Sequence, residues 1–185
     1  MINLRIDLDQ KDLQGFLNAA PRTIFNAQRS AIETTATFAN KLLTQRMTVA
    51  TGLPAAVFKQ FRVFKKIQSY KDHSNYLGIV FLGYNPIKAA YVGKLSEIGA
   101  GAMAGQYYFE HGFIATMSSG HRSIFKREGA KTFRIVRNGK EHFVQHIFEQ
   151  KVNLPQAEAI TEQVANEAAN ELQRRYLEKL QATLK

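Results

Sequence analysis

The chain has 185 residues, of which 45% are apolar and 22% are charged, and these ordinary proportions predict a single domain with a buried core over residues 1–185. It contains no cysteine, which excludes a disulfide framework, a cysteine-based zinc site and a thiol nucleophile. The 25 Lys and Arg against 15 Asp and Glu give a net charge of +10, so nucleic acid and acidic protein surfaces are the first partners to consider. No apolar run approaches the roughly 20 residues of a membrane-spanning helix, and no signal peptide is expected.

The N-terminal part, residues 1–50, is predicted to hold one strand followed by helices. Residues 2–8 alternate Ile and Leu with polar residues, which predicts a half-buried strand. Asp9 can then cap a short helix over residues 10–19. Pro21 suits the first turn of a longer amphipathic helix, whose apolar residues recur at i, i+3, i+4 and i+7 to about Met47. We expect that helix to end before Gly52.

The middle part, residues 51–150, is predicted to be a β-rich core. Residues 61–68 and 75–84 are rich in β-branched and aromatic residues, which indicates two antiparallel strands joined by a long loop. Residues 87–95 fit either a short strand or an irregular connection, and the glycine-rich run 99–105 predicts a flexible loop over about 96–112. Four strand-like pieces follow, at 113–117, 123–127, 132–139 and 141–148. Asn138-Gly139 is typical of a tight hairpin that needs positive φ.

The C-terminal part, residues 153–185, is predicted to be one helix of roughly seven turns. Asn153 can cap it, Pro155 suits its first turn, and Gln156 has the spacing of a capping box. An apolar stripe follows at strict i+4 spacing, broadened by Ala157, Ala165 and Ala169: Ile160, Val164, Ala168, Leu172, Tyr176, Leu180 and Leu184. This stripe packs either on the sheet or on a neighbouring copy. The predicted fold class is therefore α+β, a small basic antiparallel β core flanked by a long N-terminal helix and a long C-terminal helix.

No complete catalytic or metal-binding pattern is present, so we predict no catalytic residues, no metal and no cofactor. His142 and His146 are four residues apart, but a zinc-protease helix needs a glutamate directly after the first histidine, and here Glu141 precedes it. The glycines of 99–105 lack the spacing and context of a dinucleotide-binding or phosphate-binding loop. A small hydrolase centred on His121 or on the His142/His146 pair is the weakest of the functional interpretations.

Half of the net charge lies in residues 118–143, where seven cations stand against two glutamates. Apolar residues recur through the same segment, and the alternation of Phe133 and Ile135 with Arg134 favours aromatics in the core and cations on a solvated face. Either DNA or a neighbouring subunit can meet such a surface. The candidate residues that face DNA or a protein partner are Arg122, Lys126, Arg127, Lys131, Arg134 and Arg137, with Lys65 and Lys66 from the earlier hairpin.

One run in this region resembles a known family. The matching residues are Phe113, Ala115, Ser119, Gly120, His121, Ile124, Phe125, Arg127 and Gly129, followed by a basic strand, Asn153-Leu154-Pro155 and a long terminal helix. Together they resemble the minor tail protein Z family of tailed bacteriophages. Where that family often has Leu-Pro-Ile, this chain has Phe133-Arg134-Ile135.

The resemblance implies a structural, non-enzymatic virion protein of the tail or neck, made in the cytoplasm of a bacterial host. It implies tail completion and head-tail joining, with copies forming a homo-oligomeric ring, hexameric by the resemblance, at the head-proximal end of the tail. The implied neighbours are tail tube, terminator and neck proteins and an end of packaged double-stranded DNA, and no membrane. The alternative interpretation is a stand-alone, sequence-independent nucleic-acid-binding protein.

Overall fold

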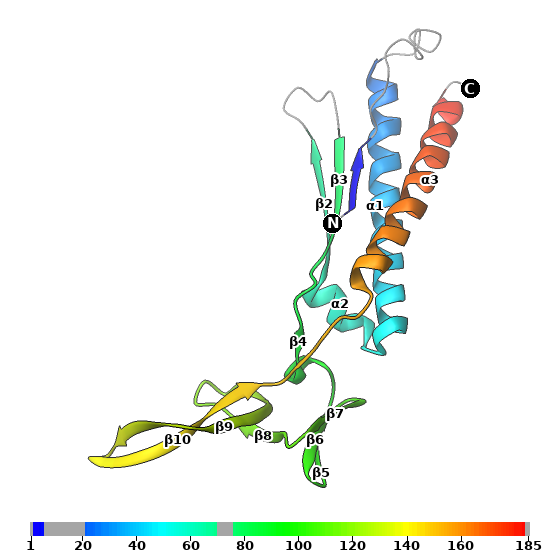
Figure 1. Cartoon of the computed structure of the whole chain (residues 1–185). Coiled ribbons are helices and arrows are strands. Elements are labelled where there is room, and N and C mark those ends of the chain that lie inside the picture. The colour runs from blue at the N-terminus through cyan, green and yellow to red at the C-terminus, as the bar shows by residue number, and fades with distance from the viewer. Residues whose placement is uncertain (1, 6–20, 70–75, 184–185) are drawn as a thin grey trace. The chain divides into compact units, whose positions relative to one another are not determined.

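The computed structural model describes residues 2–5, 21–69 and 76–183 (Figure 1). Where the sequence predicted one domain, the chain divides into two compact units. Unit 1 comprises Met1–Thr51, Phe58–Tyr84 and Gln156–Lys185, and unit 2 comprises Gly52–Val57 and Asn85–Pro155. We describe each unit by itself. In the part of the chain that the structure describes, no helix is both long and apolar enough to cross a bilayer.

Unit 1 contains a three-stranded antiparallel sheet in the order β1-β3-β2. Its strands are β1 (Ile2–Arg5), β2 (Val63–Ser69) and β3 (Tyr76–Leu82). The predicted pair at 61–68 and 75–84 is confirmed, with Phe64 opposite Phe81 in the register. The predicted first strand is observed as far as Arg5. The rest of it, the expected helix at 10–19 and the turn between β2 and β3 lie outside the described residues.

Two long helices cover this sheet. The predicted helix from Pro21 is confirmed as α1 (Pro21–Thr51), and it ends where Gly52 adopts a φ of 64°. The second long helix, α3 (Ala157–Thr183), packs against α1 and β1. Its apolar stripe from Ile160 to Leu180 is buried, so the stripe packs within its own chain. Ala169, which was expected to broaden the stripe, is exposed.

Two details of the helices differ from the sequence prediction. α3 begins at Ala157, not at Asn153, because Gln156 takes a φ of 61° and its carbonyl oxygen accepts the Ile160 N–H at 2.9 Å. Gln156 therefore occupies the N-cap and does not close a capping box with Asn153. The short helix α2 (Ala55–Phe61) was not predicted. It follows Pro54, whose carbonyl oxygen accepts the Val57 N–H at 3.0 Å.

Unit 2 consists of short antiparallel sheets. The predicted flexible loop at 96–112 is wrong, since β5 (Leu95–Ile98), β6 (Gly101–Ala104) and β7 (Tyr107–Glu110) form a three-stranded sheet there. The small residues of β6 allow the neighbouring strand to approach closely. A Cβ on Gly101 would lie 2.5 Å from the Phe109 carbonyl oxygen, and Ala102 and Ala104 are fully buried. Residues 87–95 hold β4 (Ile87–Lys88) and the 3-10 helix η1 (Ala89–Tyr91), and β4 pairs with β11 (Lys151–Val152).

The remaining strands of unit 2 are β8 (Phe113–Thr116), β9 (Arg122–Arg137) and β10 (Lys140–Glu149). The predicted pieces at 123–127 and 132–139 belong to one strand, β9. Asn138 and Gly139, at φ of 53° and 72°, turn the chain into β10 as predicted. The predicted fold class is confirmed, since the chain is α+β with antiparallel sheets between a long N-terminal and a long C-terminal helix.

Candidate interaction surface

The distal half of the β9–β10 hairpin is a two-stranded ladder. β8 pairs only with Arg122–Phe125 at the start of β9. A bulge follows, in which residues 128–131 of β9 face the single residue His146 of β10. Beyond it, residues 132–145, here called the ribbon, pair with each other from Thr132 opposite Gln145 to Arg137 opposite Lys140. Among the described residues no third strand joins the ribbon, and an isolated two-stranded hairpin is marginally stable in water.

Six of the predicted site residues lie along β9. Arg122, Lys126 and Arg127 precede the bulge, Lys131 is within it, and Arg134 and Arg137 belong to the ribbon. The Arg127 guanidinium lies 5.1 Å from the centre of the Phe113 ring, a cation–π contact. Arg134 forms an ion pair with Glu141 on β10. All six residues therefore lie in one strand, β9, which is longer than the separate pieces predicted at 123–127 and 132–139.

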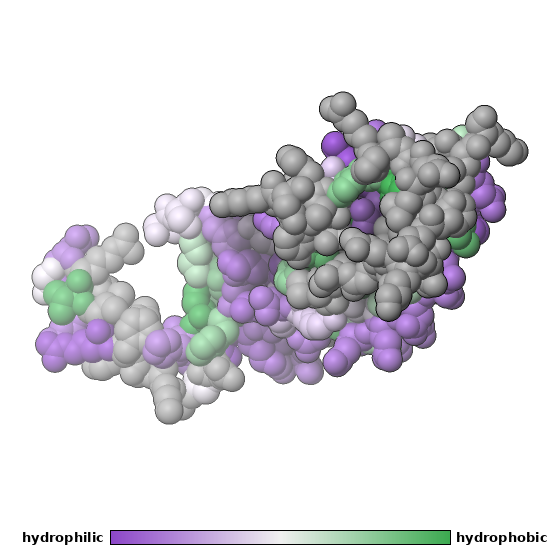
Figure 2. Space-filling view, turned by 90° about the horizontal axis from the view of Figure 1, so that it is seen from above, coloured by the Kyte–Doolittle hydropathy of each residue, from purple (hydrophilic) through white to green (hydrophobic). Residues whose placement is uncertain are grey.

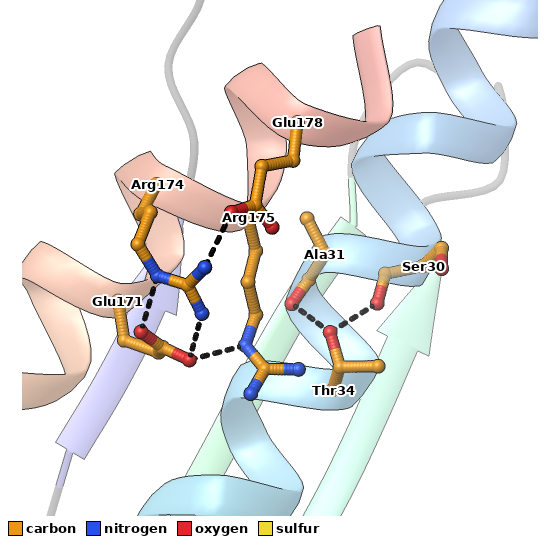
Figure 3. A network of polar contacts seen from close by, with 7 residues as sticks. All are labelled: Ser30, Ala31, Thr34, Glu171, Arg174, Arg175 and Glu178. Carbon is orange, nitrogen blue, oxygen red and sulfur yellow. Dashed lines mark hydrogen bonds and ion pairs between the residues drawn. The ribbon is translucent and has the colours of Figure 1, made fainter. Parts of the chain in front are cut away.

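Lys65 and Lys66 lie in β2 of unit 1, so the structure does not bring them together with the β9 cations in one unit. Lys65 Nζ donates a hydrogen bond to Thr37 Oγ1 at 2.8 Å. It lines an open groove of about 620 Å³ together with Lys41 of α1 and Arg175 of α3. Figure 3 shows Arg175 reaching from α3 toward Thr34 of α1 while its Nε donates to Glu171. This groove is a second cationic feature, and no local sequence pattern could predict it because three separate segments form it.

The ribbon combines charge with exposed apolar surface. Val136 has 65% of its surface exposed, and Arg134, Lys140 and Glu141 are exposed beside it. Figure 2 shows hydrophilic and hydrophobic residues side by side at the left of the view, where Figure 1 draws this hairpin. Phe125, before the bulge, is buried as the alternation predicted. The same prediction for Phe133 and Phe143 concerns side chains outside the described set.

A second cluster in unit 2 centres on Glu149 at the end of β10. Its Oε1 lies 2.6 Å from His121 Nε2, and its Oε2 lies 2.9 Å from Lys88 Nζ. Partial burial alone would raise the pKa of Glu149, but hydrogen bonds from His121 and Lys88 outweigh it and lower the pKa. Both carboxylate oxygens are engaged, so the cluster is arranged to join β4, the start of β9 and β10. The sequence could not reveal it, because Glu149 lies 28 residues from His121.

The histidines considered for metal binding are not arranged as on a zinc-protease helix. His142 and His146 both lie in the strand β10, and the His146 ring stacks on the Phe148 ring with centroids 6.1 Å apart. Over residues 2–5, 21–69 and 76–183, no three His, Cys, Asp or Glu side chains are grouped so that they could hold a metal ion.

Comparison with protein-family models, with curated proteins and with solved structures finds no match to this chain. The evidence that bears on the function of this chain is therefore the geometry of β9 and β10 and the sequence resemblance of residues 113–129.

Proposed function

We propose that this chain is a structural component of a tailed-phage virion, a tail completion or neck protein that forms a ring at the head-proximal end of the tail. In that position it contacts neighbouring tail proteins and an end of packaged double-stranded DNA, and it carries out no chemical step. The sequence resemblance of residues 113–129 gives the proposal its biological setting. The single structural observation that carries it is the ribbon at residues 132–145.

The ribbon supports an assembly role for a physical reason. A two-stranded ladder without a third strand has few contacts to offset the conformational entropy lost on ordering. Exposed apolar groups on such a ladder gain free energy when a partner covers them, and exposed cations select a partner of opposite charge. We therefore expect a hairpin of this kind to be more stable when it is docked on another subunit than when it is exposed to water.

The second candidate function is stand-alone, sequence-independent binding of nucleic acid. The observation that favours it is the number of cations that β9 carries, from Arg122 to Arg137. Lys and Arg contacts to phosphates carry no sequence information, and their affinity falls steeply as salt rises. This interpretation predicts a protein that binds DNA tightly without any partner protein.

A double charge reversal in β9, Arg127→Glu with Lys131→Glu, tests the proposal in phage particles. We expect infectious particles to fall at least about tenfold, the factor that corresponds to ~1.4 kcal/mol of lost docking energy. The loss should appear as heads without tails or as particles that leak DNA, scored by electron microscopy, while circular dichroism of the purified variant stays unchanged.

The matched control reverses two exposed cations away from β9, Lys59→Glu with Lys94→Glu, and should leave the yield of particles unchanged. Mass spectrometry of purified virions must also find the chain in the particle. Its absence there, combined with tight salt-sensitive DNA binding by the pure protein, would replace the virion proposal with the second candidate.

A further inference from the structure

We propose that the free edge of β2 and the groove beside it bind an extended, acidic segment of a partner protein, which adds to the sheet of unit 1 as a further strand. The ligand class is a peptide in β conformation with carboxylates opposite Lys65 and Lys66. This site belongs to unit 1, whereas β9 belongs to unit 2, so peptide binding here does not depend on the proposed virion role.

The edge of β2 leaves backbone groups without a partner. β2 is an outer strand of its sheet, and among the described strands it pairs only with β3 (Figure 1). The Gly83 N–H donates to the Arg62 carbonyl oxygen at 2.8 Å, so these two residues form a hydrogen-bonded pair at the start of the β2–β3 ladder. Such pairs alternate along an antiparallel ladder, so Val63, Lys65 and Ile67 direct their N–H and C=O groups away from β3. A further strand would bind these groups.

Two of the same residues line a groove with their side chains. Lys65 and Ile67 lie on one face of the sheet, since alternate residues of a strand share a face, and both line the open groove of about 620 Å³ with residues of α1 and α3. No residue of β3 lines this groove, although β3 is the neighbour of β2 in the sheet. The groove therefore opens beside the free edge of β2. A strand added there would place every second side chain in the groove.

Three cations converge on the groove with donors to spare. Among the described residues, Lys41 has no ion-pair partner, and Lys65 Nζ donates only to the uncharged Thr37 hydroxyl, at 2.8 Å. Arg175 Nε donates to Glu171 at 2.6 Å, and Figure 3 shows the two terminal nitrogens of the guanidinium directed toward α1. A carboxylate that enters the groove would therefore meet ammonium and guanidinium donors that other carboxylates do not occupy.

The lining of the groove favours a peptide over DNA. Phe38 and Ile67 are half-buried and give the groove an apolar part beside its cations. The backbone of DNA has acceptors but no N–H donors, so it would leave the outward carbonyl groups of β2 without partners. Glu33 also lines the groove, but its carboxylate is paired with Arg29 at 2.9 Å. The cations therefore select an anionic ligand, and the strand edge selects an extended peptide among the anionic ligands.

The lysines of β2 disfavour a second copy of the same strand as the occupant. Antiparallel pairing of β2 with β2 would bring Lys65 and Lys66 of one copy against those of the other, and like charges across a strand pair destabilise it. Lysines on an edge strand are a common protection against such self-pairing. An acidic strand would instead gain from both, because Lys65 faces the groove and the exposed Lys66 lies on the opposite face of the sheet.

The experiment measures binding of a fluorescein-labelled peptide, Thr-Val-Glu-Glu-Val-Val-Thr, to the purified full-length protein by fluorescence anisotropy. In an antiparallel register its glutamates lie opposite Lys66 and Lys65, and its valines lie opposite the apolar residues of β2 on either side. We expect saturable binding that weakens as salt rises. A peptide with Lys-Lys in place of Glu-Glu should bind about tenfold more weakly or worse, because like charges then face each other. Absence of binding by the glutamate peptide would overturn the proposal.

Charge-reversed proteins test the same contacts from the other side. Lys65→Glu/Lys66→Glu should weaken binding of the glutamate peptide about tenfold or more and should restore binding of the Lys-Lys peptide, which an unfolded variant could not do. Lys41→Glu, on α1, should weaken binding about two- to fivefold, the range of an exposed ion pair. The control Lys59→Glu/Lys94→Glu, outside the groove, should bind as wild type does. A Lys65→Glu/Lys66→Glu protein that still prefers the glutamate peptide would overturn the proposal.

Methylation of backbone nitrogens in the peptide tests strand addition directly. Methyl groups on the residues opposite Val63, Lys65 and Ile67 remove the N–H groups that face β2, so binding should fall about tenfold or more. Methyl groups on the intervening residues point away from β2 and should leave binding unchanged. Equal effects of the two sets would show that the peptide does not add as a strand. Displacement of the peptide by single-stranded oligodeoxythymidylate, together with equal effects of the two sets, would assign the groove to nucleic acid instead.

Discussion

The carboxylate of Glu149 shows how one side chain can hold together segments that are distant in the sequence. Its side chain is only 14% exposed, and its two oxygens meet His121 and Lys88. Hydrogen bonds to the ionised form hold the pKa of Glu149 below its ordinary value despite partial burial. A carboxyl group with a lowered pKa in the folded state stabilises the fold above its unfolded pKa, and this contribution disappears as the pH falls through the folded pKa.

Glu149→Gln should therefore lower the free energy of unfolding of unit 2 at neutral pH by about 1–2 kcal/mol, the cost of weakening two partly exposed charge-assisted hydrogen bonds. The difference from wild type should shrink as the pH drops below roughly 4.3, where an unfolded glutamate becomes protonated. Urea denaturation at pH 7 and at pH 3.5 measures both effects. Glu97→Gln, at an exposed carboxylate, is the matched control and should have little effect at either pH. An equal loss of unfolding free energy at pH 7 and at pH 3.5 would show that the ionised carboxylate of Glu149 does not stabilise the fold.

At the scale of elements, periodicity decided how much the sequence could reveal. The periodic stripe predicted α3 well, because that helix buries one face and exposes the other. The β-branched and aromatic composition of residues 61–68 and 75–84 predicted β2 and β3 equally well. The run 99–105 was mistaken for a loop because its glycines and alanines carry no period. What makes β6 a strand is the close approach of β7, which places the Phe109 carbonyl oxygen beside Gly101 and which no local pattern encodes. The Glu149 cluster was hidden for the same reason.

The α1–α3 contact gives a prediction at this scale. Leu172 is 6% exposed on the stripe of α3, whereas Leu177 on the same helix is 51% exposed. Leu172→Ala should lower the free energy of unfolding by about 2–5 kcal/mol because it leaves a cavity beneath the buried stripe of α3. Leu177→Ala creates no cavity and should change it by about 0.5 kcal/mol or less. Chemical denaturation followed by helical circular dichroism compares the two, and similar costs would mean that α3 does not pack on α1 as described.

At the scale of the molecule, the sequence located the cationic segment but not its form. Alternation of Phe133 and Ile135 with Arg134 predicted a strand with a core side and a solvent side. A period of two does not indicate whether a third strand pairs with that strand, so the two-stranded form of the ribbon could not be predicted. The structure instead ends the three-stranded pairing at Phe125 and inserts a bulge before the ribbon. Some of the cations that the sequence predicted as site residues therefore lie on a segment that pairs only with itself among the described strands.

Because the ribbon pairs only with itself among the described strands, we can predict the effect of removing it. In the shortened chain, Asn-Gly replaces residues 133–144 and joins Thr132 to Gln145. These two residues are already paired across the hairpin, so a two-residue turn can close the gap without moving the bulge. Because the ribbon is paired only with itself among the described strands, its removal should change the melting temperature by only a few degrees, in line with ~1 kcal/mol or less of lost stability. Self-association should be lost completely, since the docking element is gone. Calorimetry and sedimentation of the same sample measure the two effects together, and a collapse of the melting temperature would show that the ribbon supports the fold and is not an arm for assembly.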